Sequence, residues 1–134
     1  MSMIPQELNW VEKRAACTIA RVFNELCDGI MSDVAAINKA LGPNSLFSAD
    51  MHSDGSTIFV GQPGRIPRRR VNVGTGHDHI VVVQEWNREQ WSASIGLNNE
   101  GRCILRLDDG TELEQWQFRK KALEDLFFGD KEQP

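Results

Sequence analysis

The chain has 134 residues and a mass of 15.1 kDa, which is the size of one domain with its own hydrophobic core. Its composition, 40% hydrophobic and 25% charged, argues against intrinsic disorder, and no apolar run approaches the roughly 20 residues that span a bilayer. The formal net charge of −4 disfavours general binding to nucleic acids, which depends on clustered cations.

The first third of the chain predicts helices. Apolar residues recur every three or four positions across residues 8–30, as they do on one face of a helix. Glycine weakens a helix interior, so we expect a break or kink near residues 28–29. Ser32 is then a candidate N-cap for a second helix that Gly42 and Pro43 would end. A single bent helix stays an alternative, because the apolar phase continues across the junction.

From residue 46 onward the hydrophobic period changes to two, which is typical of strands. The pair Asp54 and Gly55 is a strong hairpin signal between residues 46–51 and 57–60. Residues 80–83 form a continuous β-branched run, which predicts a central strand covered on both faces. Two alternating segments follow, and they are separated by a turn. They comprise residues 91–97 and 102–107.

The last predicted element is a helix over residues 113–128, with Gly129 as its C-cap. Its expected buried side is Leu113, Trp116, Leu123, Leu126 and Phe127. We therefore predict one α+β domain spanning residues 1–134. It has an N-terminal helix or helix pair, an antiparallel meander sheet of five to seven strands, and a C-terminal helix packed on one face.

The cysteines and the N-terminus predict a soluble cytoplasmic protein. Residues 1–9 contain neither the basic nor the apolar run of a secretory signal. The separations between Cys17, Cys27 and Cys103 match no zinc-ligand spacing, and three is an odd number for a disulfide framework. We therefore expect three reduced cysteines that pack as small hydrophobic residues.

All three histidines, His52, His77 and His79, lie in the strand-rich region. In an extended strand His77 and His79 would point to the same face, about 6–7 Å apart, and offer two imidazoles to one metal ion. His52 would add a third ligand if its strand pairs nearby, with Asp50 or Asp54 as a carboxylate ligand. Exposed histidines at a strand end, without any ligand, explain the same pattern.

Four arginines gather in residues 64–70, namely Arg65, Arg68, Arg69 and Arg70. On an acidic body such a patch suits an acidic protein partner or a small anionic ligand, because guanidinium groups pair bidentately with oxyanions. The alternatives are a solvated loop and a charged sheet edge that prevents edge-to-edge pairing. No aromatic residue interleaves the arginines, which argues against nucleic acid as a partner.

Trp86 and Trp91 flank four residues that read as a tight hairpin, where aromatic residues stabilise each other across the strands. Aromatic side chains also line ligand pockets, so a second interpretation is a pocket bounded by Trp86, Trp91 and Arg70. Its ligand would be small and anionic or aromatic.

The chain contains no glycine-rich nucleotide motif, phosphate loop, nucleophile elbow or zinc-protease motif, so no enzyme class or cofactor is implied. We expect a non-enzymatic binding or protein-interaction domain that forms a homodimer, since a short chain covers both faces of a sheet most easily with a partner. Two alternatives stay open. One is a metal-binding protein or metal-dependent enzyme, and the other is a pocket protein for a small ligand.

Overall fold

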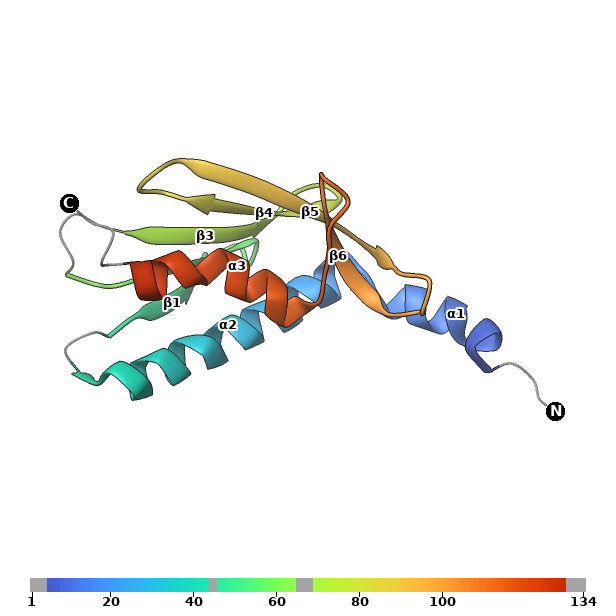
Figure 1. Ribbon diagram of the computed structural model, residues 1–134, viewed down its shortest axis with the longest axis horizontal. Helices are drawn as coiled ribbons and strands as arrows, with labels where there is room; N and C mark the ends of the chain where they lie inside the picture. The colour runs from blue at the N-terminus through green and yellow to red at the C-terminus, as the bar shows by residue number, and fades with distance from the viewer. Residues whose placement is uncertain (1–4, 44–45, 65–68, 130–134) are drawn as a thin grey trace.

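The computed structural model describes residues 5–43, 46–64 and 69–129, with side chains from Trp10 onward. The predicted α+β order is confirmed: a helix pair comes first, a seven-stranded sheet follows, and a helix ends the described chain (Figure 1). In chain order the elements are α1 (Pro5–Ala16), α2 (Ile19–Leu41), β1 (Ser48–Met51), β2 (Thr57–Gly61), β3 (Arg70–Thr75), β4 (His79–Gln84), β5 (Glu89–Leu97), β6 (Cys103–Leu107), β7 (Glu112–Leu113) and α3 (Gln115–Phe128).

The helix pair breaks at residues 17–18, not near residues 28–29. Thr18 has extended backbone angles, and its hydroxyl accepts a hydrogen bond from the backbone N–H of Arg21 at 3.2 Å, so it is the N-cap of α2. The helix then runs without interruption through Gly29 to Leu41. Within the described ranges, no helix has both the length and the apolar character that crossing a bilayer requires.

The sheet is an antiparallel meander in which each strand pairs with the next along the chain, from β1 to β7. Alternate residues of its central strands face α2 and α3, which cover one face of the sheet (Figure 1). Cross-strand pairs such as Val60 with Val71 and Val73 with Val82 are fully buried there. Burial of these apolar surfaces is the main force that holds the helices on the sheet.

The other face of the sheet differs from the prediction for residues 80–83. Ile80 and Val82 are fully buried under the helices, but Val81 and Val83 on the opposite face are only half-buried. The helices packed on the sheet, α2 and α3, lie on a single side of it (Figure 1). Coverage of β4 on both faces is therefore not achieved by the described part of one chain.

A disulfide joins Cys17 to Cys103 across 86 residues, so the expectation of three reduced cysteines is wrong. The bridge ties the junction of α1 and α2 to the start of β6, and only Cys27 is free and buried. Sequence spacing could not reveal it, because the two sulfurs meet only after the sheet has formed. Disulfides are rare in reducing compartments, so the cysteines no longer support the prediction of a cytoplasmic location.

Candidate functional site

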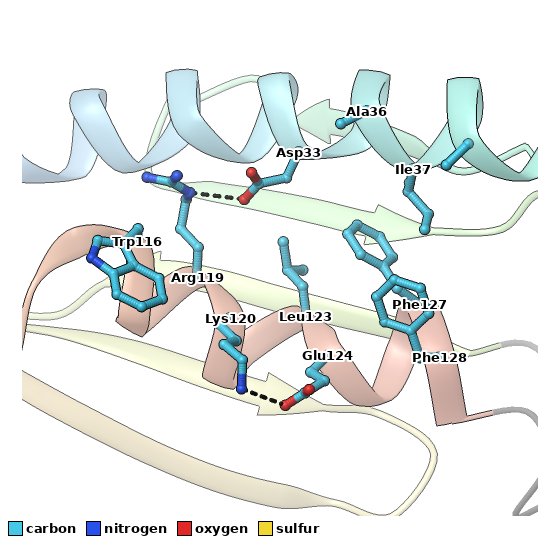
Figure 2. A pocket seen from close by; sticks show the side chains of 11 residues that line it. Asp33, Ala36, Ile37, Trp116, Arg119, Lys120, Leu123, Glu124, Phe127 and Phe128 are labelled. Carbon is cyan, nitrogen blue, oxygen red and sulfur yellow. Dashed lines mark hydrogen bonds and ion pairs between the residues drawn. The ribbon is translucent and has the colours of Figure 1, made fainter.

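A groove of about 460 Å³ runs between α2 and α3, with the sheet behind it (Figure 2). One wall comes from α2 and the other from α3, and the lining is largely apolar. The lining residues are Asp33, Ala36, Ile37, Ala40, Trp116, Arg119, Lys120, Leu123, Glu124, Phe127 and Phe128.

The two walls have different shapes. The α2 wall carries two exposed alanines one helical turn apart, Ala36 and Ala40, which leave the helix backbone accessible. The α3 wall carries large aromatic side chains at its ends: Trp116 is 54% exposed and Phe128 is 58% exposed. The prediction that Trp116 lies on the buried side is therefore wrong. Its indole N–H donates a hydrogen bond to Glu114 at 3.2 Å, at the start of the helix.

Two polar side chains of α3 bind α2: Gln115 donates its Nε2 to Glu25 at 2.7 Å, and Arg119 makes the second contact. Arg119 of α3 reaches α2, where its Nε donates to Asp33 at 2.8 Å (Figure 2). It passes over Gly29, and a Cβ at that position would overlap the guanidinium. Gly29 therefore serves the close approach of the helices, which is why it stands inside α2 without ending it.

The charged groups of the groove pair with one another. Asp33 binds Arg119 across the helices, and Lys120 binds Glu124 along α3 at 3.2 Å (Figure 2). Among the residues that the structure describes, these four are the only charged ones in the lining, and their formal charges sum to zero. Within residues 5–43, 46–64 and 69–129, no serine, threonine, cysteine or histidine lines the groove. The arrangement is suited to contact with an apolar surface that is edged by charges of both signs.

The histidines occupy two hairpin turns and one strand start. His52 lies in the turn after β1, where its Nδ1 is 2.9 Å from Asp54, and His79 begins β4 with its Nδ1 2.8 Å from Asp78. His77 is exposed in the turn between β3 and β4. Among residues 5–43, 46–64 and 69–129, no three His, Cys, Asp or Glu side chains gather closely enough to hold a metal ion. A metal site stays a prediction.

Of the four arginines in the predicted patch, the structure describes two, Arg69 and Arg70. Arg65 and Arg68 lie outside the described residues. Arg69 is only 3% exposed, its guanidinium stacks on Trp86 at 4.2 Å, and its Nη2 donates to the carbonyl of Asp125 at 3.5 Å. That carbonyl lies in the last turn of α3, where the helix dipole favours a cation. Arg69 thus supports the end of α3 from inside the fold.

The structure does not bring Trp86, Trp91 and Arg70 together. Trp91 pairs in register with buried Val82 and packs edge-on against Phe118 of α3, with 4.9 Å between ring centroids. Arg70 lies on the opposite face of the sheet and binds a carboxylate of Glu85 at 2.8 Å. Trp91 and Arg70 thus lie on opposite faces of the sheet, and the ligand pocket predicted from these two residues and Trp86 stays a prediction.

Sequence reasoning missed the α2–α3 groove because it needs two helices that are distant in the chain. A local signal was nevertheless present: Trp116, Lys120, Glu124 and Phe128 follow one another at intervals of four, which places them on one side of a helix. Comparison of the chain with protein-family models, with curated proteins and with solved structures found no match. A functional proposal therefore rests on the geometry of the groove itself.

Proposed function

We propose that the protein is a non-enzymatic interaction domain that binds an amphipathic helix of a protein partner in the α2–α3 groove. The observation that carries this proposal is the placement of two exposed aromatic residues, Trp116 and Phe128, at the two ends of an apolar groove. Aromatic residues are costly to leave in water and are enriched among the residues that dominate binding energy at protein interfaces.

The dimensions of the groove support a helical ligand. Trp116 and Phe128 are 12 positions apart on α3, which corresponds to roughly 18 Å along a helix and to about three turns of a ligand lying beside it. The small side chains of Ala36 and Ala40 on the facing wall leave room for such a helix to approach. Helix-in-groove recognition uses the same combination of an apolar floor and anchors at helical spacing.

The charges support a helix over a small anionic ligand. Each charged residue of the groove already has a partner of opposite sign within it. A small anion that approached Lys120 or Arg119 would also meet the carboxylate already paired with it, which repels the anion. An amphipathic helix instead buries its apolar stripe on the floor and leaves its flanking charges beside the paired rim, where they stay hydrated.

The test is a titration of isotope-labelled protein with two synthetic peptides, followed by amide NMR. One is an amphipathic helix of about 15 residues with leucines at i, i+4, i+8 and i+12, and the other has the same composition in scrambled order. We expect saturable shift changes confined to α2 and α3 with the patterned peptide alone. Equal responses to both peptides, or no saturable response to either at a concentration where the protein is monomeric, would contradict the proposal.

Two neighbouring alanines provide a matched pair of variants. Ala35 and Ala36 are both exposed on α2, but only Ala36 lines the groove. Ala36→Glu places a carboxylate where the apolar stripe of the peptide would lie, so we expect at least about a tenfold loss of affinity. Ala35→Glu adds the same charge outside the groove and should bind as the unaltered protein does. Equal affinities of the two variants would place the peptide elsewhere.

A further inference from the structure

The exposed side of α3 carries a row of four residues whose order reads apolar, positive, negative, apolar. Trp116, Lys120, Glu124 and Phe128 are each four positions from the next, all are exposed, and all line the groove. Residues at this spacing form one ridge on a helix surface, which is the feature that packs against another helix.

This order is complementary to itself when it is read in the opposite direction. A two-fold axis through the middle of the row, between Lys120 and Glu124, turns a second copy of α3 antiparallel to the first. Lys120 then faces Glu124 of the second copy, and each Trp116 faces a Phe128. In a parallel arrangement the same row would place like charges together, which is unfavourable. A dimer with two-fold symmetry requires this kind of self-complementary surface.

We infer that the helix bound in the groove is α3 of a second copy of this chain, packed antiparallel with the two-fold axis between Lys120 and Glu124. This inference rests on the proposed function, because it names the partner of the same groove. The antiparallel packing accounts for two features of the site at once: the exposed aromatic residues at its ends and the adjacent opposite charges at its centre.

The α2 wall and the existing ion pairs are compatible with this packing. Ala36 and Ala40 present small side chains to the incoming helix, and helices in contact approach to about 8–10 Å between axes only where side chains permit it. Lys120 and Glu124 are already 3.2 Å apart within one helix. In the dimer each can exchange this exposed intrahelical partner for the equivalent group of the other copy, so neither charge is left unpaired.

The primary experiment measures oligomeric state by sedimentation velocity over a range of micromolar concentrations, with two single variants. In the dimer, Lys120→Glu turns both central Lys–Glu pairs into Glu–Glu pairs, and Glu124→Lys turns both into Lys–Lys pairs. We expect a concentration-dependent dimer for the unaltered chain and at least about a tenfold weaker dimer for each variant. Lys121→Glu makes the same charge change one position away, off the row and outside the groove, and should dimerise normally.

Mixing the two variants tests the register. Lys120→Glu presents two negative groups and Glu124→Lys two positive ones, so an equimolar mixture should form a heterodimer although neither forms a strong homodimer alone. A mixture of Lys121→Glu with Glu124→Lys has the same net charges but lacks the matched positions, and it should show no comparable gain. Circular dichroism of each variant checks that α3 remains helical.

The outcomes separate this inference from the proposed function. A protein that stays monomeric while it still binds the patterned peptide keeps the proposed function and overturns the second copy as its ligand. A dimer that both single variants leave unchanged uses another surface, which also overturns the inference. A monomer that binds no peptide contradicts both. Restored association in the matched mixture alone supports both the partner and its orientation.

Discussion

Both faces of α3 carry aromatic residues, but these residues lie in opposite environments. Phe118 on the inner face is 1% exposed and packs against Trp91, whereas Phe128 on the outer face is 58% exposed. Burial of a phenylalanine contributes about 1.5–3 kcal/mol, which the inner residue realises in folding and the outer one does not. Hydrophobicity alone therefore does not assign a role: the inner face stabilises the domain, whereas the outer face is the one that we propose binds another molecule.

The largest effect should come from the inner face. Phe118→Ala removes a buried ring between α3 and the sheet and leaves a cavity, so we expect unfolding to become easier by about 3–5 kcal/mol. Urea denaturation followed by circular dichroism measures this difference. A loss under about 1 kcal/mol would mean that Phe118 does not anchor α3, and it would break the distinction between the two faces.

The disulfide should come next in size. Cys17→Ser opens a bridge between residues 86 positions apart, and we expect a loss of about 2–4 kcal/mol in stability, with peptide binding in the groove retained because neither cysteine lines it. Reduction of the unaltered protein is the control and should give a similar loss. Without reductant the denatured chain should titrate as one free thiol, Cys27, in Ellman's assay. Three thiols under those conditions would disprove the bridge.

The outer face should show the reverse of the inner one. Phe128→Ala removes an exposed ring, so we expect stability to change by less than about 0.5 kcal/mol while affinity for the patterned peptide falls at least about tenfold. Met51→Ala removes another exposed apolar side chain, one that does not line the groove, and should leave affinity unchanged. If Phe128→Ala destabilised the fold as Phe118→Ala does, the two faces would not differ in role.

The smallest effect concerns a turn remote from both faces. The backbone N–H and hydroxyl of Ser56, together with His52, lower the pKa of Asp54 to about 2. In the unfolded chain the pKa of this carboxyl is about 3.9. The lowered pKa therefore stabilises the folded protein at a pH above the unfolded pKa, and this stabilisation is lost as pH falls toward about 2. Asp54→Asn should weaken this dependence, as measured by urea midpoints between pH 5 and 2, and a parallel pH profile in both proteins would contradict the assignment.

The fold was predictable because its signals are local. Hydrophobic periods of 3.6 and 2 separate the helices from the strands, and short turns between successive strands indicate a meander. The break at residues 17–18 was missed because the apolar phase continues across it. Gly29 wrongly suggested a break, because its role is to make room for Arg119.

The candidate site was less predictable because it depends on contacts between distant residues. The pairing of Cys17 with Cys103 requires the complete sheet, and the placement of Arg69 inside the fold requires the end of α3. The exposure of Trp116 follows from where α3 lies relative to α2, which no hydrophobic period encodes. The spacing of Trp116 and Phe128 is visible in the sequence, but only the structure shows that both residues line one groove.

The disulfide also divides the chain by covalent topology. The loop closed by Cys17 and Cys103 contains α2 and strands β1 to β5, whereas β7 and α3 follow it as an open tail. One wall of the groove thus belongs to a covalent ring and the other to the tail. If the tail detaches by local unfolding, the ring stays closed and the groove is lost. Amide exchange in α3 should slow when the groove is filled, so it reports occupancy without any need to follow the ligand.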